Sequence, residues 1–391
     1  MHKKIVNFVK YNKLILAIYR FFGNLLILFL SLFVRVKKNR ILFMSFGGQK
    51  YDDSPKELYE RMKSDTFFAG YEFIWGFTRP DKFDIGCKKI KVDTIRFYII
   101  ALSCKIWINN SSVERGLKLK RNKTIEINTW HGTPLKKMGA DIVNYKGYRS
   151  KARRRKGKTI YCSQSDYDRE IFIRLFNTEK ENILLSDLPR NDSLLSYSEE
   201  QKALIRKQVG IPNDKKIILY APTFREYERD KFNSCYIKPP ITIEKWKSKL
   251  SSDYVLLLRA HYEVVNVLGL EDDGFVYNVS KYPCLNDLIA ISDMLISDYS
   301  SIYFDYAITE KPMLNFSYDL EEYEKFRGLY LDMNEIMPCN VNYTEDTLLA
   351  EIQSFNFDAY VENTKRFKNR FAPYAGKASE TVIEQLKQFC Q

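Results

Sequence analysis

Asn128-Thr129-Trp130-His131-Gly132-Thr133-Pro134-Leu135-Lys136-Lys137-Met138-Gly139 follows an alternating apolar run, Thr124–Ile127, that is typical of a β-strand. Gly132 allows the backbone to bend or to approach a ligand closely. Pro134 suits the first turn of a helix, where its missing N–H costs nothing. We therefore expect His131 on a loop between a strand end and a helix start, at the edge where open α/β sheets bind ligands. A helix start beside lysines also favours phosphate.

The chain has only three histidines. A lone histidine in a turn is more often a capping residue than a catalytic one. The interpretation of His131 therefore depends on whether other parts of the chain carry related chemistry at strand ends.

Length and composition indicate two folded domains. The 391 residues exceed one ordinary domain, and 45% hydrophobic residues with 27 tyrosines and 26 phenylalanines exclude extensive disorder. The net charge of +13 indicates an anionic partner, either nucleic acid, an acidic membrane surface or a phosphate-rich substrate. The seven cysteines include no C-x-x-C pair, which argues against a zinc site and favours reduced thiols in the cytosol.

Residues 1–39 are set apart by an apolar stretch, Leu14–Val34, with basic residues on both sides. Arg20, Gly23 and Asn24 interrupt the stretch, which is long enough to span a bilayer. Because an intramembrane arginine is costly, we expect a helix lying in the membrane interface. A single membrane span and a soluble helix packed on the body are the alternatives.

The next segment reads as the first unit of a parallel α/β sheet. An apolar strand over Arg40–Phe46 enters Gly47-Gly48, and a helix begins at Pro55 and continues to about Lys63. The dinucleotide-binding pattern is not met, because its third glycine is missing. Further strands are expected at 73–77, 105–110 and 159–163, with a helix over Asp166–Phe176.

A basic run, from Lys146 to Lys158, follows the His131 segment. It is consistent with a solvated helix face, with a surface for anionic lipid or a phosphate-rich acceptor, or with nucleic acid, although no recognition motif accompanies it. Arg190 lies in a loop that begins at Pro189. It could meet a phosphate, or it could pair with Asp192.

The second half repeats the pattern of buried strands that end in polar residues. After a connector at 196–214, one strand enters Pro222-Thr223 and another, Tyr254–His261, ends in Arg259 and His261. A third strand is followed by Asp298-Tyr299-Ser300-Ser301, at the start of a helix. The free N–H groups and the hydroxyls there could bind phosphate, and Ser300 could at the same time cap the helix. Asp298 and Asp305 could bind a ribose or an acceptor hydroxyl. A strand at Met313–Phe316 and a helix after Gly376 complete the chain.

These blocks together resemble the CDP-glycerol glycerophosphotransferase family, the teichoic-acid primases and polymerases of Gram-positive bacteria. The order and spacing are similar over about residues 40–370, and Phe224 departs from the Trp that many members carry. Residues 1–39 resemble the membrane-associating region of the shorter, primase-like members. The resembling blocks are Thr129–Lys136, Pro189–Asp192, Tyr220–Thr223, Arg259–Tyr262 and Asp298–Ser301 with Asp305.

The resemblance implies a GT-B-like α/β architecture of two Rossmann-like domains facing a cleft. We expect a membrane-associating segment (1–39), an acceptor domain (40–195), a linker (196–214), a donor domain (215–375) and a C-terminal helix (376–391). The implied reaction is attack of a hydroxyl of a lipid-linked saccharide on the glycerol-bearing phosphate of CDP-glycerol, which releases CMP at the cytoplasmic face of the membrane.

The resemblance also implies roles for individual residues. His131 is the expected base and His261 a second catalytic residue, while Arg190, Arg259 and the Ser300-Ser301 helix start would stabilise the diphosphate. No cofactor, structural metal or nucleic acid is expected, although a loosely bound Mg²⁺ on the diphosphate is compatible with the sequence. The residues expected to bind substrate are Trp130, Gly132, Thr133, Pro134, Arg190, Pro222, Thr223, Arg259, Ala260, Ser300, Ser301 and Asp305.

Three other functions remain open at this level. A ribitol-phosphate transferase would use CDP-ribitol, which shares the CDP half of the donor. A GT-B glycosyltransferase would use a nucleotide-sugar. A non-catalytic, basic membrane-surface or nucleic-acid binder would need no cleft, so the polar residues gathered at strand ends argue against it. The sequence does not indicate an oligomeric state.

Overall fold

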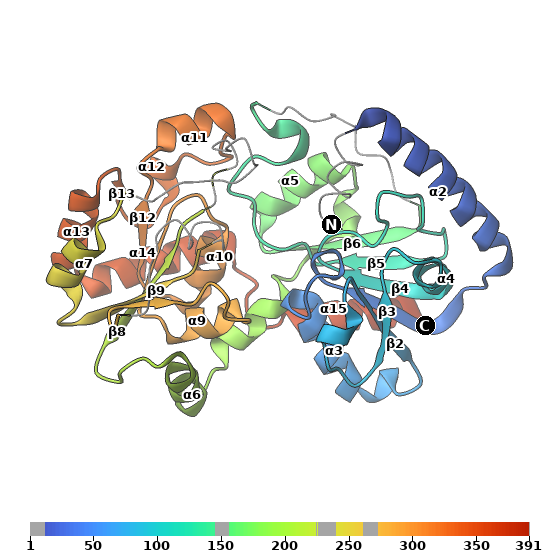
Figure 1. The fold of residues 1–391 in the computed structure, drawn as a ribbon, viewed down its shortest axis with the longest axis horizontal. Helices are drawn as coiled ribbons and strands as arrows, with labels where there is room; N and C mark the ends of the chain where they lie inside the picture. Colours follow the sequence, from blue (N-terminus) through green and yellow to red (C-terminus); the bar gives the residue numbers. More distant parts are fainter. Residues whose placement is uncertain (1–11, 145–155, 224, 226–239, 261–272, 391) are drawn as a thin grey trace.

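The computed structural model describes residues 12–144, 156–223, 225, 240–260 and 273–390. Two parallel β-sheets dominate it, and each belongs to one half of the chain (Figure 1). The first sheet has the strand order β3-β2-β1-β4-β5-β6-β7, and the second has the order β10-β9-β8-β11-β12-β13. The structure therefore confirms an α/β fold with two parallel sheets.

The first sheet is built from apolar strands that are buried on both faces, as parallel sheets require. In β1, for example, every side chain from Ile41 to Met44 is fully buried. The strands are β1 (Lys37–Met44), β2 (Glu72–Phe77), β3 (Lys88–Lys91), β4 (Cys104–Asn109), β5 (Ile125–Asn128), β6 (Lys158–Ser163) and β7 (Ile183–Leu185).

Helices cover both faces of this sheet. One face packs against α3 (Asp53–Ser64) and α15 (Ala378–Cys390), so the predicted C-terminal helix returns to the first domain. The other face packs against α4 (Ile95–Ser103), and α5 (Asp166–Phe176) follows β6. Asp192 accepts hydrogen bonds from the N–H groups of Ala378 and Ser379, at 2.9 and 2.8 Å. Asp192 therefore caps α15, and of the two possibilities considered for Arg190, the ion pair with Asp192 is not formed.

The second sheet contains β8 (Lys216–Ala221), β9 (Tyr254–Leu258), β10 (Val276–Asn278), β11 (Met294–Ser297), β12 (Met313–Phe316) and β13 (Val341–Asn342). Apolar clusters lie on its two faces, one with α9, α10 and α14 and the other with α7 and α13. The helices are α6 (Glu199–Val209), α7 (Ile243–Leu250), α9 (Leu285–Ile291), α10 (Ile302–Tyr306), α11 (Leu320–Phe326), α12 (Met333–Ile336), α13 (Glu345–Gln353) and α14 (Phe357–Phe371).

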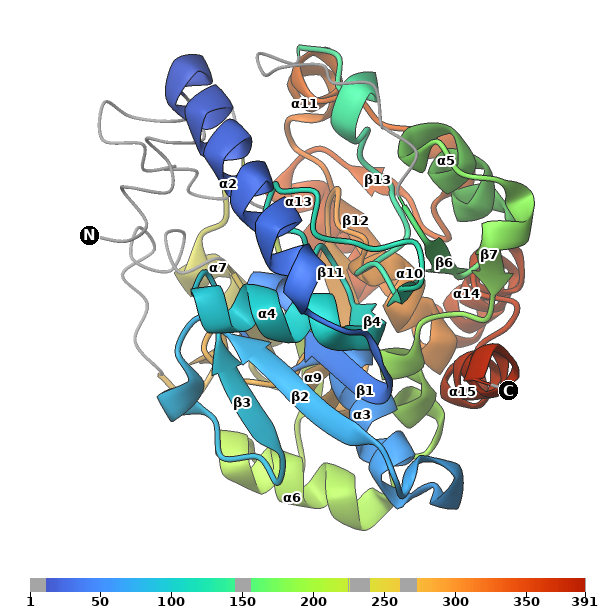
Figure 2. The ribbon, with the colours of Figure 1, turned by 90° about the vertical axis from the view of Figure 1, so that its right-hand side faces the viewer.

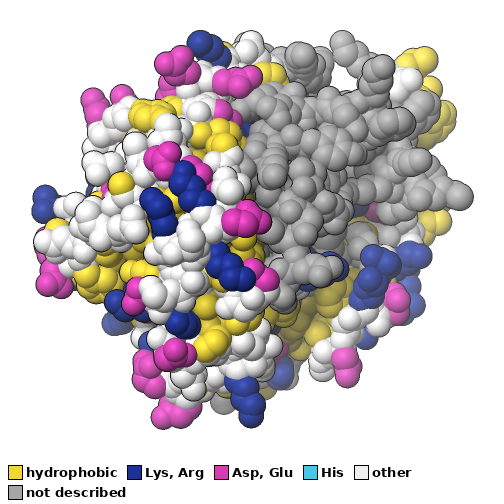
Figure 3. Space-filling view, turned by 60° about the vertical axis from the view of Figure 1, so that its left-hand side comes forward, with side chains coloured by type: hydrophobic (Ala, Val, Ile, Leu, Met, Phe, Trp, Pro, Cys, Tyr) yellow, Lys and Arg dark blue, Asp and Glu magenta, His cyan; other side chains and the backbone are white. Residues whose placement is uncertain are grey.

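Surface charges of both signs are interspersed on the second domain. Figure 3 faces this domain, and its described Lys, Arg, Asp and Glu side chains are mixed rather than separated by sign. The net positive charge of the chain is therefore not gathered on the described part of this face.

The predicted N-terminal helix is α2 (Lys13–Phe33), which lies along the outside of the first domain over α4 (Figure 2). Ile27 is buried against the domain, and Asn24 accepts a hydrogen bond from the Lys118 N–H at 2.7 Å. The helix is long and apolar enough to cross a membrane, yet only 6% of that segment is buried. Its other side exposes Leu14, Ile18, Phe21, Phe22, Leu25, Leu28, Phe29, Leu32 and Phe33.

The helix predicted to begin at Pro134 is absent. Leu135 is buried in the core of the second domain, and its carbonyl accepts a hydrogen bond from the Tyr330 N–H at 2.9 Å. Lys136 forms a bridge with Leu329, and the Lys137 N–H donates to the Gly328 carbonyl at 2.9 Å. The segment stays extended because its backbone groups pair with the second domain, and the phosphate site expected at a helix start there is lost with the helix.

Other boundaries shift slightly. Strand β9 ends at Leu258, so Arg259 and Ala260 follow it, and α3 begins two residues before Pro55. His261, Phe224 and the basic run from Lys146 to Arg155 lie outside the described residues.

Candidate active site

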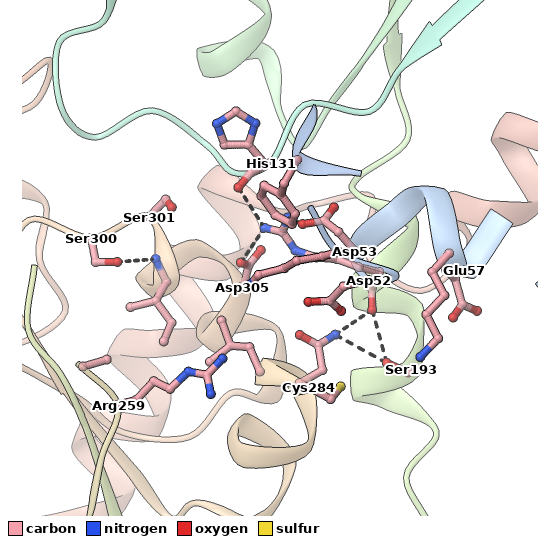
Figure 4. Close-up of a pocket in the computed structure, with 18 of the residues that line it drawn as sticks. Asp52, Asp53, Glu57, His131, Ser193, Arg259, Cys284, Ser300, Ser301 and Asp305 are labelled. Carbon is pink, nitrogen blue, oxygen red and sulfur yellow. Dashed lines mark hydrogen bonds and ion pairs between the residues drawn. The ribbon is translucent and has the colours of Figure 1, made fainter. Parts of the chain in front are cut away.

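A cavity of about 330 Å³ lies between the two domains, where the strands of both sheets end (Figure 4). It gathers seven of the residues predicted from sequence, which are His131, Arg190, Pro222, Arg259, Ser300, Ser301 and Asp305. In Figure 4, Asp52, Asp53 and Glu57 lie on the opposite side from Ser300 and Ser301, with Asp305 between them. Residues more than 200 positions apart in sequence thus share one site.

One ring nitrogen of His131 is held by the backbone. Its Nδ1 lies 2.7 Å from the carbonyl oxygen of Asn110. A carbonyl can only accept, so the neutral ring carries its proton on Nδ1 and leaves Nε2 with a free lone pair. Burial by the surrounding protein lowers the pKa of His131 from its ordinary value of 6.5, although part of the ring remains exposed. The ring is therefore neutral at pH 7 and able to accept a proton.

The backbone around His131 is held in unusual conformations. Trp130 has a φ of +52°, and its ring stacks on His131 with centroids 4.1 Å apart. Gly132 has a φ of +143°, and a Cβ added there would lie 2.7 Å from the Ser301 Oγ. Glycine is needed here both for the conformation and for the close contact between domains.

Four of the predicted substrate-binding residues of the first domain lie around the cavity rather than in it. Trp130 and Gly132 support His131 from either side. Thr133 is fully buried and donates to the Gln164 Oε1 at 2.7 Å. The Pro134 carbonyl accepts from the Tyr167 hydroxyl at 2.7 Å. Thr133 and Pro134 therefore fix the path of the segment into the second domain.

Arg190 joins the two domains through two carboxylates. Its Nη1 lies 2.8 Å from Asp53 of the first domain, and its Nη2 lies 2.7 Å from Asp305 of the second. The same Nη2 also donates to the His131 carbonyl at 3.3 Å. Burial alone would lower the pKa of Arg190, but Asp305 and Asp53 outweigh it and raise that pKa. The charge of the guanidinium is thus already neutralised by carboxylates. Arg190 therefore differs from the free phosphate-binding cation that the sequence suggested.

Asp305 is held on its other oxygen as well. The Asn191 Nδ2 donates to the Asp305 Oδ1 at 2.8 Å, and the same amide lies 3.3 Å from Asp187. Burial raises the pKa of Asp187 to about 8. Since both Asp305 oxygens have partners, its role here is to fix the domains to each other.

Arg259 enters the cavity directly after β9. Its Nη1 donates to the carbonyls of Val279, at 2.8 Å, and Tyr282. Burial lowers the pKa of Arg259, but an arginine remains charged at pH 7. One edge of the guanidinium is thus anchored while the group as a whole lines the cavity.

Ser300 and Ser301 line the second-domain wall. The Ser300 Oγ accepts from the Ile302 N–H at 3.3 Å, but the N-cap position of α10 is occupied by Ser301, whose side chain forms no capping hydrogen bond, so the predicted cap by Ser300 is wrong. Thr223 and Ala260 lie beside the cavity, and the Thr223 N–H donates to Asp298 at 2.8 Å.

The Asp298 carboxylate is buried in an ion pair and does not face the cavity. It is buried, and its Oδ2 pairs with Arg225 at 2.7 Å. Arg225 also pairs with Asp319 at 2.7 Å and lies over the rings of three tyrosines, Tyr299, Tyr318 and Tyr323. The predicted contact of Asp298 with a ribose or acceptor is therefore not available in this arrangement.

Sequence reasoning missed the wall formed by the loop after β1 and the start of α3. The Gly-Gly turn at the end of a buried strand was a usable signal, because ligands bind at this sheet edge. In the described part of the chain, no group of three or more His, Cys, Asp or Glu side chains could hold a metal ion. The lining residues that were not predicted are Phe46, Lys50, Asp52, Asp53, Lys56, Glu57, Ser193, Ala221, Cys284, Leu285, Asn286 and Ile302.

Comparisons with known proteins agree on one family. The family model described as CDP-Glycerol:Poly(glycerophosphate) glycerophosphotransferase matches residues 26–388. The chain is 37% identical over 366 residues to the teichoic acid poly(glycerol phosphate) polymerase of Staphylococcus epidermidis, covering 89% of this chain and 50% of that protein. It is 32% identical over 366 residues to the teichoic acid glycerol-phosphate transferase of Staphylococcus aureus, covering 93% of that protein.

A solved structure has the same fold throughout. The structure of the wall teichoic acid polymerase TagF superposes with a TM-score of 0.82 at 32% identity and covers 94% of this chain and 93% of that one. The same polymerase was also solved as a histidine variant soaked with CDPG. The chain thus spans about half the length of the S. epidermidis polymerase and nearly all of the S. aureus transferase.

Proposed function

The chain belongs to the CDP-glycerol:poly(glycerophosphate) glycerophosphotransferase family, and we propose that it transfers glycerol phosphate from CDP-glycerol to a hydroxyl of a membrane lipid-linked teichoic-acid precursor. The observation that carries this proposal is the cavity between the domains. It combines a neutral His131 with Arg259 and the Ser300-Ser301 turn. The two parallel sheets with a site between their carboxyl ends also support a GT-B-like architecture.

His131 is the general base in this mechanism. The acceptor hydroxyl gives its proton to Nε2 while its oxygen bonds to the glycerol-bearing phosphorus. The bond from that phosphorus to the bridging oxygen breaks, and CMP leaves with the electron pair. The Asn110 carbonyl holds the tautomer that makes Nε2 the acceptor, and it stabilises the imidazolium that forms.

The second domain provides the charge stabilisation. In this mechanism, Arg259 and the Ser300 and Ser301 hydroxyls, which all line the cavity, stabilise the negative charge that develops on the leaving phosphate. Pro222, Thr223 and Ala260 position this wall. We assign Arg190 and Asp305 to positioning, because their charges already satisfy each other. His261 stays a prediction as a second catalytic residue.

Release of CMP by the full-length protein tests the reaction. Donors would be CDP-glycerol, CDP-ribitol and a UDP-sugar, each with and without a lipid-linked disaccharide acceptor. We expect acceptor-dependent CMP release with CDP-glycerol. Turnover of CDP-ribitol alone would move the assignment to ribitol-phosphate transfer, and release of UDP alone would indicate a glycosyltransferase. If no nucleotide is released from any of the donors, an enzymatic function of this kind is contradicted.

Helix α2 supports action at the cytoplasmic face of the membrane, where a lipid-linked acceptor would be found. Its exposed apolar side is flanked by a groove whose described lining contains eight lysines and arginines and no Asp or Glu. Apolar side chains beside cations are typical of helices in the interface of an anionic bilayer. The structure packs one side of α2 on the body, so we favour interfacial attachment over a span.

Replacing both Phe21 and Phe22 by glutamine is expected to weaken binding to phosphatidylglycerol vesicles by at least about tenfold. Each apolar side chain contributes about 1.5–3 kcal/mol when it leaves water fully, and these two are 67% and 62% exposed. Vesicle sedimentation measures the effect. The matched control is glutamine at Leu204 and Phe357, which are exposed on α6 and α14. Equal binding by both double variants would contradict attachment through α2.

A further inference from the structure

A buried ion pair lies at β5, the strand that leads into the His131 segment. Glu126 on this strand and Lys120 are 0% and 3% exposed, and the Lys120 Nζ lies 3.0 Å from the Glu126 Oε2. Taking two charges out of water costs free energy, so a buried pair is weak evidence for a stabilising role. Neither residue is among the described side chains that line the cavity. The role of the pair therefore lies in the groups that it contacts.

The other oxygen of Glu126 fixes the amide of Asn109 at the end of β4. The Asn109 Nδ2 donates to the Glu126 Oε1 at 2.9 Å, and Asn109 is fully buried. The ammonium of Lys120 favours the ionised form of Glu126, and an ionised carboxylate can only accept hydrogen bonds. The amide must therefore turn its nitrogen toward Glu126 and its oxygen away from it.

The Asn109 oxygen shapes the backbone that follows β4. The Ser111 N–H donates to the Asn109 Oδ1 at 3.1 Å, and this hydrogen bond closes an Asx turn. Asn110 lies in the middle of the turn, and its carbonyl oxygen is the atom that lies 2.7 Å from the His131 Nδ1. The direction of that carbonyl thus depends on the turn, and the turn depends on the orientation of the Asn109 amide.

We propose that Glu126 and Asn109 are positioning residues for His131, because together they direct the Asn110 carbonyl that holds the ring. The inference rests on the proposed function, in which His131 is the general base. The neutral ring can accept a proton on Nε2 only while Nδ1 carries the other proton. A ring without the Asn110 contact would exchange between tautomers and would act as a base for only part of the time.

Two double variants separate this positioning role from the stability of the ion pair. K120M/E126L removes both charges and also removes the acceptor for the Asn109 amide. K120M/E126Q removes the same charges but keeps a side-chain oxygen that can accept from Asn109. Because neither variant leaves an unpaired buried charge, both are expected to fold, with melting temperatures close to or above that of the wild type.

The tautomer of His131 is the direct readout. The chain has only three histidines, so protein labelled with ¹⁵N in histidine gives a simple magnetic resonance spectrum. The signals that are missing from His131→Asn identify the ring. We expect a ring protonated on Nδ1 in the wild type and in K120M/E126Q, and a mixture of both tautomers in K120M/E126L.

Kinetics supply the second readout. The kcat for acceptor-dependent CMP release should fall about tenfold to hundredfold in K120M/E126L, because a small misplacement of a catalytic group has an effect of this size. The KM for CDP-glycerol should stay within about threefold of the wild type, because the donor is expected on the second domain. The kcat of K120M/E126Q should return most of the way to that of the wild type.

The pH profile should change in the same way. Burial lowers the pKa of His131, and the hydrogen bond to the Asn110 carbonyl opposes this effect. Loss of that hydrogen bond lowers the pKa further, so the acid limb of kcat/KM should move to lower pH in K120M/E126L. Asp53 and Arg190, the other charged groups that act on the ring, are the same in both double variants.

Asn109→Leu tests the same link from its other end and keeps the ion pair. It should change the tautomer and the kcat in the same direction as K120M/E126L. It also decides the question if either double variant fails to fold.

An unchanged tautomer and kcat in K120M/E126L, or equal losses in the two double variants, would overturn the assignment of Glu126 while leaving the proposed function intact. An unchanged tautomer in Asn109→Leu would overturn the assignment of Asn109. A wild type that releases no CMP would overturn the proposed function, and the tautomer of the ring would still decide whether Glu126 and Asn109 hold it in place.

Discussion

The variant His131→Asn is expected to lose about 10²–10⁴-fold in kcat for acceptor-dependent CMP release, which is the range for removing a positioned general base. Asparagine offers an amide N–H near the position of Nδ1, so the hydrogen bond to the Asn110 carbonyl can persist. It has no basic nitrogen at the position of Nε2. The loss in kcat therefore measures the absence of the proton-accepting nitrogen and not a change in the conformation of the loop.

The pH dependence supplies an independent readout of the same residue. A general base acts in its deprotonated form, so activity is retained above the pKa of His131 and falls as pH decreases through it. Burial lowers that pKa below 6.5, and the acid limb of kcat/KM should therefore lie below pH 6.5. In His131→Asn this limb should disappear from the residual activity.

Donor binding is the control for His131→Asn. Calorimetry should give an affinity for CDP-glycerol within about threefold of the wild type, because the donor is expected on the second domain and its contacts are not changed. Residual activity within about tenfold of the wild type, with an unchanged acid limb, would contradict the role of His131 as base.

Local sequence signals predicted the elements of this fold well. The helix Asp166–Phe176 and the strand Met313–Phe316 have the predicted bounds, because a capping residue or a short apolar run marks each end. The motif blocks also predicted which strand ends would meet, since polar residues after buried parallel strands share one edge. Seven predicted residues accordingly line the cavity.

Contacts between segments that are distant in sequence explain why some predictions were wrong and why some site residues were not predicted. The extended path after Pro134 depends on residues 327–330, almost 200 positions later, whose pairing no local pattern reveals. Likewise, Arg190 looked available for phosphate, yet Asp53 lies 137 positions before it and Asp305 115 positions after it. The wall formed by the loop after β1 and the start of α3 was missed because its Gly-Gly turn does not match the dinucleotide-binding pattern, although a turn at the end of a buried parallel strand marks the edge where ligands bind.

Replacing Arg190 by methionine is expected to lower the free energy of unfolding by about 3–5 kcal/mol, the usual cost of breaking a buried ion pair from one side. The side chains of Asp53 and Asp305 are only 6% and 4% exposed, so both carboxylates would lose their counter-charge without gaining water. Urea titration followed by near-ultraviolet circular dichroism measures the loss. CMP release should fall as well, because the Arg190 contact with the His131 carbonyl is removed.

Arg174→Met is the matched control, since it makes the same chemical change in an ion pair with Asp141 whose arginine side chain is 54% exposed. An exposed pair contributes about 0–1 kcal/mol, so this variant should be nearly as stable as the wild type. A triple variant that combines Arg190→Met with Asp53→Asn and Asp305→Asn also removes the charges of both partners. It should recover much of the lost stability, because no unpaired buried charge remains. If Arg190→Met and Arg174→Met are equally stable, Arg190 does not hold the two domains together. If the triple variant is less stable than Arg190→Met alone, the cost comes from lost packing instead of unpaired charge.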